Sequence, residues 1–248
     1  MLEKLIASRL ITPPAIWGKL PAHADFVRSG MRHGESEGWQ PWLAQHGGLV
    51  GASSTGAPPV AFVVPPGTLA FAPRRFVVGV ITPSGDKVGR RHALIVYQLA
   101  HPRWVEHHFR QPLAPLDDWL FWLARAVARH TGTQGAADAA ALERTVRALW
   151  LDHAPGLSAL WLSGRSGVER PPERRVQAQA MLDKLAGRAS ADDPATQLRG
   201  VRFLPWTDWP QRLLKPRAQS AFWQQDAKGA FVNATDRMPE LWIGSGAA

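Results

Sequence analysis

Residues 76–97 read FVVGVITPSGDKVGRRHALIVY and hold the clearest strand signal in the chain. Two short runs rich in β-branched residues, 76–81 and 92–97, flank the polar loop 83–91. Parallel strands need a crossover of roughly a dozen or more residues, usually through a helix, and this loop is too short for one. The two runs are therefore predicted to pair as antiparallel strands.

The same patterns predict the elements on either side of this pair. Short apolar runs predict strands at 16–20, 60–64, 220–224 and 230–232. Helical spacing and end signals predict helices at 117–132, 136–151 and 172–186. We therefore expect one α+β domain, an α/β fold with a central mixed or largely antiparallel sheet and helices packed on it. Its parts are a β-rich half at about 14–115, a helical half at about 116–200 and a C-terminal β-hairpin at about 218–235.

Composition excludes several classes of protein. The 248 residues include no cysteine, so disulfide frameworks and thiolate zinc sites are excluded. No apolar run approaches the ~20 residues that span a bilayer, and we expect no transmembrane segment. The charged N-terminal residues are unlike a signal peptide. A soluble cytoplasmic protein is the expectation.

The charge of +9 and the twelve tryptophans suggest nucleic-acid binding. Single-strand binders interleave exposed aromatic and basic side chains, whereas most tryptophans here lie among apolar neighbours, as at 119–123 and 148–151. The positive charge is also divided between the two ends of the chain. We expect no specific nucleic-acid partner, and a nucleic-acid-binding module remains the weaker alternative.

No catalytic or metal-binding pattern stands out. His101, His107 and His108 lack a glutamate at the spacing of a zinc motif, so no metal site is predicted, and no cofactor is expected. Residues 85–91 resemble a phosphate-binding loop, but they lead into a strand rather than a helix N-terminus. An enzyme that handles phosphate or hydrolyses its substrate with the 84–91 loop remains the second hypothesis, with Asp86, Lys87 and Arg90 as its groups.

Polar residues next to the apolar strands are the candidate site residues. We hypothesise that they cluster at one end of the sheet, where they either brace loops or present a surface to a partner. Both aspartates of the set have cations near in sequence, which predicts buried ion pairs that fix the loops. The set comprises Lys19, Asp25, Ser84, Asp86, Gly89 and Arg90. Trp39, Trp42 and Trp223 are candidate interface anchors, although core packing is the favoured role for the first two.

Three stretches resemble the TagF (ImpM) family of type VI secretion accessory proteins, and they occur in the family's order. They are WGKLPAHADFVR at 17–28, WQPWL at 39–43 and GVITPSGDKVGRR at 79–91, with SAFW at 220–223 as a weaker match. Three positions depart from the family pattern. Gln40 replaces an acidic residue, Ala24 replaces a frequent glycine, and HAL at 92–94 replaces an aromatic-proline-leucine sequence.

The resemblance implies a regulatory protein of bacteria and not an enzyme. Members of the family are cytoplasmic post-translational repressors of type VI secretion assembly. They engage a forkhead-associated scaffold protein or membrane-complex subunits. Some relatives are fused to a PP2C-type phosphatase, for which this chain has no spare length. The fold implied is an α/β sandwich, in agreement with the pattern of strands and helices.

Overall fold

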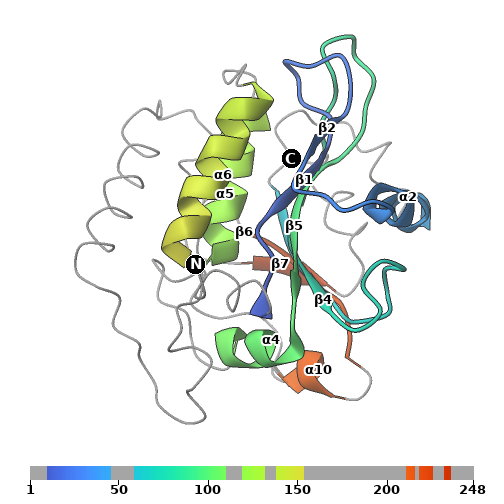
Figure 1. Cartoon of the computed structure of the whole chain (residues 1–248), viewed down its shortest axis with the longest axis vertical. Coiled ribbons are helices and arrows are strands. Elements are labelled where there is room, and N and C mark those ends of the chain that lie inside the picture. Colours follow the sequence, from blue (N-terminus) through green and yellow to red (C-terminus); the bar gives the residue numbers. More distant parts are fainter. Residues whose placement is uncertain are drawn as a thin grey trace.

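A computed structural model describes residues 10–45, 59–109, 119–131, 138–153, 211–215, 218–225 and 232–235. Seven strands in this part form one sheet in the order β2-β1-β5-β4-β3-β6-β7, and every neighbouring pair is antiparallel. Helices pack on the sheet (Figure 1), so the predicted fold class is confirmed. The strands are β1 Ala15–Gly18, β2 Val27–Ser29, β3 Val60–Val64, β4 Phe76–Thr82, β5 Leu94–Ala100, β6 Ala221–Gln225 and β7 Val232–Thr235.

The predicted antiparallel pair forms the centre of the sheet as β4 and β5. Its register runs from Phe76 opposite Ala100 to Thr82 opposite Leu94. Every residue of both strands is buried, because helices cover both faces, and this explains the continuous apolar runs in the sequence. Gly79 lets the backbones approach, since a Cβ there would lie 2.2 Å from the carbonyl oxygen of Val96.

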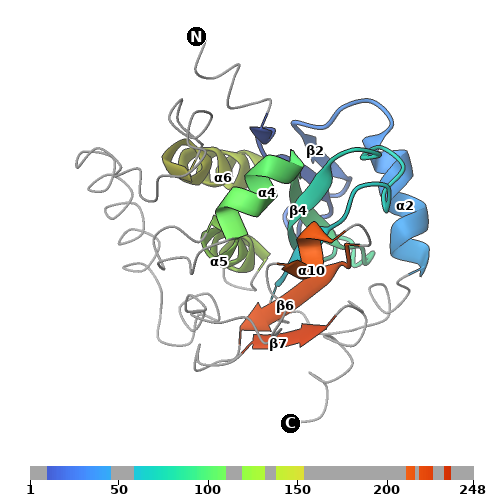
Figure 2. The same ribbon diagram turned by 90° about the horizontal axis from the view of Figure 1, so that it is seen from below.

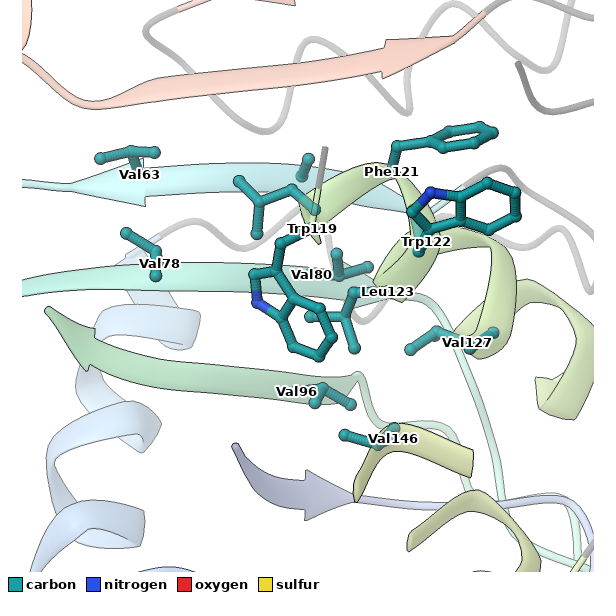
Figure 3. Packing of buried hydrophobic residues seen from close by; sticks show 14 of the residues in the cluster. Val63, Val78, Val80, Val96, Trp119, Phe121, Trp122, Leu123, Val127 and Val146 are labelled. Atoms are coloured by element: carbon teal, nitrogen blue, oxygen red, sulfur yellow. The ribbon is translucent and has the colours of Figure 1, made fainter. Parts of the chain in front are cut away.

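Two helices cover one face of the sheet, α5 Trp119–Thr131 and α6 Ala139–His153. They confirm the helices predicted at 117–132 and 136–151, while the helix predicted at 172–186 lies outside the described residues. Figure 3 shows Trp119 and Leu123 of α5 lying over the valines of β4 and β5. The indole Nε1 of Trp119 donates to Gln98 Oε1 at 2.6 Å, so this buried amide is satisfied from the helix.

The opposite face carries α2 Glu35–Gln45 (Figures 1 and 2). Trp39 of this helix is fully buried, and its ring centroid lies 5.1 to 5.9 Å from those of four other aromatic residues. The buried Tyr97 hydroxyl donates to Glu35 Oε2 at 2.6 Å, which ties the start of α2 to the central strand. The four aromatic neighbours are Trp42, Phe62, Phe71 and Tyr97.

The candidate interface tryptophans therefore belong to the core. Trp39 and Trp42 pack under α2, and Trp223 lies in the cluster on the α5 side, all with at most 7% of their surface exposed. A side chain that is already buried within its own chain cannot anchor a partner without unfolding its surroundings. The interface role of these three residues is not supported by their placement.

The remaining elements are the strands β6 and β7, which extend the sheet beyond β3, and two short helices. β6 pairs with β3, with Phe222 opposite Phe62, and with β7, so the C-terminal hairpin predicted at 218–235 extends the main sheet. The helix α4 Pro102–Phe109 was not predicted, and it lies near the short helix α10 Gln211–Leu214 (Figure 2). None of the helices in the described ranges has the length and apolar character needed to cross a bilayer.

A buried histidine at the α5–α6 contact predicts acid sensitivity. Burial lowers the pKa of His130 to about 4, so the folded protein resists protonation that the unfolded chain accepts near pH 6.5. Stability from this group is therefore full above pH 6.5 and falls as the pH drops towards 4, by about 3 kcal/mol in total. Denaturant unfolding between pH 6.5 and 4 should show a fall in the free energy of unfolding of wild type. The same plot against pH should be flatter for His130→Gln. Equal slopes in the two proteins would contradict the assignment.

Candidate functional site

Two loops meet at one end of the sheet, and all six of the sequence-predicted polar residues lie in them. The β1–β2 loop spans residues 19–26, and the β4–β5 loop spans 83–93. β1 and β4 both pair with β5, so the two loops leave the sheet side by side (Figure 1). Gly18 allows the close approach, because it has φ +137° and a Cβ there would lie 2.1 Å from the carbonyl oxygen of Ala93.

Asp86 is the centre of this loop pair. Its carboxylate is completely buried and accepts hydrogen bonds on both oxygens. Lys19 Nζ and Arg90 Nε each donate to Oδ2 at 2.7 Å. The backbone N–H groups of Val88 and Arg90 donate to Oδ1 at 3.1 and 2.8 Å. Gly89 supplies the left-handed residue of the turn, with φ +87°, and its N–H donates to the carbonyl oxygen of Asp86.

These contacts fix the charge of Asp86. Burial by itself raises the pKa of this carboxyl, but the hydrogen bonds from Lys19, Arg90 and Val88 outweigh it and hold the pKa well below its usual range. The carboxylate is therefore ionised near neutral pH, and four donors occupy its oxygens. A carboxylate engaged in this way acts as a structural brace and not as a general base or nucleophile.

A second set of contacts joins the two loops to each other and to α6. The Arg90 guanidinium donates to the carbonyl oxygen of Ala24, and the N–H of Lys87 donates to that of His23 at 3.0 Å. His23 Nε2 accepts the N–H of Ala139 at 2.8 Å, at the first residue of α6. The loop pair is therefore held at its tip as well as at its base.

The structure separates the predicted residues into two groups. Lys19, Asp86, Gly89 and Arg90 come together, as described above. Asp25 was expected in a buried ion pair, but its side chain is 97% exposed and lies 3.9 Å from Arg90 Nη2. Of the two aspartates, Asp86 is buried in an ion pair, whereas Asp25 is not, so the prediction of a buried ion pair is wrong for Asp25. Ser84 lies at the loop base, where its carbonyl oxygen accepts the N–H of His92 at 3.0 Å.

The aromatic part of the site was not predicted from the sequence. Phe26 stacks on Trp17 with centroids 5.8 Å apart, and His92 meets both rings edge-on. Lys19 Nζ lies 5.3 Å from the centroid of the Phe26 ring, within reach of a cation–π contact. Burial lowers the pKa of His92. The signal available in the sequence was Phe26, an aromatic residue in the short stretch after the strand that contains Trp17.

The geometry argues against a phosphate-binding loop. A phosphate site needs free backbone N–H groups at a helix N-terminus. The N–H groups of Val88 and Arg90 already donate to Asp86, and the loop leads into β5. Across the ranges that the structure describes, no three histidine, aspartate or glutamate side chains gather as a metal site requires.

The part of the chain that contains this site is similar to known proteins. The family model described as the TagF N-terminal domain, type VI secretion system-associated, matches residues 15–149, which is more than half of the chain and includes both loops. The crystal structure of PA0076 from Pseudomonas aeruginosa PAO1 is similar in fold, with a TM-score of 0.50 and 20% identity. That match covers 95% of this chain and 96% of the other. No curated protein matched the sequence.

The matched region contains the Asp86 network, the loop tips and strands β1 to β5 of the sheet that carries them. The family model spans the elements from β1 into α6, including the three stretches at 17–28, 39–43 and 79–91 whose resemblance was noted in the sequence. With more than half of its length matched, this chain belongs to the type VI secretion system-associated TagF family.

Proposed function

We propose that the chain is a cytoplasmic, non-enzymatic regulator of a type VI secretion system. It represses assembly of the apparatus post-translationally by binding another protein of the system. The partner is a forkhead-associated scaffold protein or a membrane-complex subunit. The family match supports the link to type VI secretion.

The observation that carries the proposal is the closed Asp86 network. All the strong polar groups at the centre of the loop pair are used to hold the loops, with Lys19 and Arg90 both donating to the same carboxylate oxygen. Binding residues are commonly carried on loops that a rigid scaffold positions. The arrangement therefore favours a recognition surface over a reaction centre.

The rival function is an enzyme that uses Asp86, Lys87 and Arg90. Such an enzyme needs titratable groups that converge in a cleft with pKa values tuned to the reaction. Here the pKa of Asp86 is moved away from neutrality, and Lys87 is exposed at the loop tip. These observations favour the binding function.

The test is to overproduce the protein in a bacterium that has the matching secretion system and to measure export of a secreted substrate and assembly of the sheath. We expect both to fall while the levels of the apparatus proteins stay constant, because repression is post-translational. Undiminished export at high protein levels would contradict the proposal. Purified protein should also show no hydrolysis of generic phosphate esters, and turnover that is lost in Lys87→Ala would favour the enzyme instead.

A further inference from the structure

The tips of the two loops carry an exposed surface next to the Asp86 network, and Arg90 and the Val88 backbone belong to both. We call it the basic rim, and it consists of Asp25, Phe26, Lys87, Val88, Arg90 and Arg91. Phe26 is 39% exposed and Val88 is 62% exposed. Within the described part of the chain, only one other large hydrophobic side chain, Leu151, is comparably exposed. Two apolar groups are thus presented to solvent on loops that lie against each other.

The charge of the basic rim is unbalanced. The basic rim has three cations, Lys87, Arg90 and Arg91, and a single exposed carboxylate, that of Asp25. Arg90 is shared with Asp86, whereas Lys87 and Arg91 form no ion pair with any other residue that the structure describes. The surface is therefore complementary to a negatively charged partner.

The basic rim is also held in place before any partner arrives. The desolvation free energy of burying two charges offsets much of their mutual attraction. The Lys19–Asp86 pair is therefore better explained as fixing the positions of the loops than as adding net stability. Preorganised loops lose little conformational entropy on binding. Exposed aromatic and arginine side chains, both present here, are enriched at protein–protein interfaces.

We propose that the basic rim binds an acidic segment of a partner protein, with apolar side chains of that segment packing on Phe26 and on Val88. The inference rests on the proposed function and adds the chemistry of the partner. Acidic side chains pair with Lys87 and Arg91, and the apolar contact gives the specificity that exposed ion pairs alone do not.

Two other anionic partners fit less well. Polybasic membrane anchors usually have four or more cations beside a membrane-inserting element, and the basic rim has three cations and two apolar side chains. Single-stranded nucleic acids need several free aromatic faces. Phe26 is the aromatic residue of the rim, and Trp17 and His92 already contact its ring.

The test uses overlapping peptides that tile the cytoplasmic proteins of the matching secretion system, probed with the purified full-length chain. We expect the strongest binding to peptides that combine acidic and apolar residues. Fluorescence anisotropy on the best peptide should show about tenfold or more weaker binding for Lys87→Glu/Arg91→Glu and for Val88→Asp. The control is Arg144→Glu/Arg147→Glu, which makes the same change of charge on the exposed face of α6 and should bind as wild type does. Melting curves verify that each variant is folded.

Three results would overturn the inference. Equal loss in the control variant would show that only net charge matters. Tighter binding to a single-stranded oligonucleotide or to vesicles of anionic lipid, abolished by the rim variants, would assign the surface to those partners. Binding that survives all rim substitutions would place the site elsewhere. If the rim variants still repress secretion, this inference fails and the proposed function stands. If wild type does not repress secretion, the proposed function itself fails.

Discussion

Asp86→Ala is expected to lower the melting temperature by about 10 °C. The substitution leaves the Lys19 ammonium, which is almost completely buried, without its counter-charge. It also removes the acceptor of the Val88 and Arg90 N–H groups. Both losses act on the loop pair, so amide hydrogen exchange should increase first in residues 84–91. Thermal melting followed by circular dichroism measures the effect.

Asp25→Ala is the matched control, because it also removes a carboxylate beside Arg90. The Asp25 side chain is 97% exposed, and its contact at 3.9 Å is screened by solvent, so the melting temperature should change by about 1 °C or less. Similar melting of Asp86→Ala and wild type would contradict the account of the loops.

Acid unfolding gives a second measure of Asp86. The pKa of this carboxyl is lowered in the folded protein, so the stability it contributes is present above the pKa of an unfolded aspartate, about 4, and is lost as the pH falls further. The free energies of unfolding of wild type and Asp86→Ala should therefore converge in strong acid. This window lies below the one expected for His130, so the two effects are separable.

Trp39→Ala is expected to reduce the free energy of unfolding by about 3–5 kcal/mol. The side chain is fully buried, and its removal leaves a cavity between Tyr97, Phe62 and the rest of α2. Denaturant unfolding measures the loss. Gln40→Ala, at the adjacent exposed position of the same helix, should change stability by no more than about 0.5 kcal/mol.

The same variant separates the two roles that the sequence left open for Trp39. A core residue loses stability when it is truncated, whereas an interface anchor loses partner binding with stability unchanged. We expect the first result from the burial of the side chain. Wild-type stability together with lost binding would contradict the core assignment.

The central hairpin and the two helices on its α5 face were predictable from sequence, because each depends on a local pattern. The order of the strands was not, since β6 inserts beside β3 from about 160 residues away in the chain. The helix α4 was missed because it has only eight residues, too few for a sustained helical period in the sequence.

The sequence predicted which polar residues form the site, but it did not predict which of them pair with each other. Lys19 and Asp86 are 67 residues apart, and they meet only because β1 and β4 both pair with β5. Sequence reasoning assigned each aspartate to cations near it in the chain, which is correct for Arg90 with Asp86 and misses Lys19. The exposure of Asp25 and the packing of Phe26 on Trp17 depend on the loop conformations, which a single sequence does not specify.

The most direct test of the central claim, that the Asp86-braced loops present a binding surface for a type VI secretion protein, is affinity capture of partners. The purified chain is incubated with lysate of cells that produce the matching secretion system, and captured proteins are identified by mass spectrometry. We predict recovery of a secretion component by wild type and by Arg144→Glu/Arg147→Glu, and its loss with Lys87→Glu/Arg91→Glu. Recovery of no secretion component, or equal recovery by the rim variant, would contradict the account.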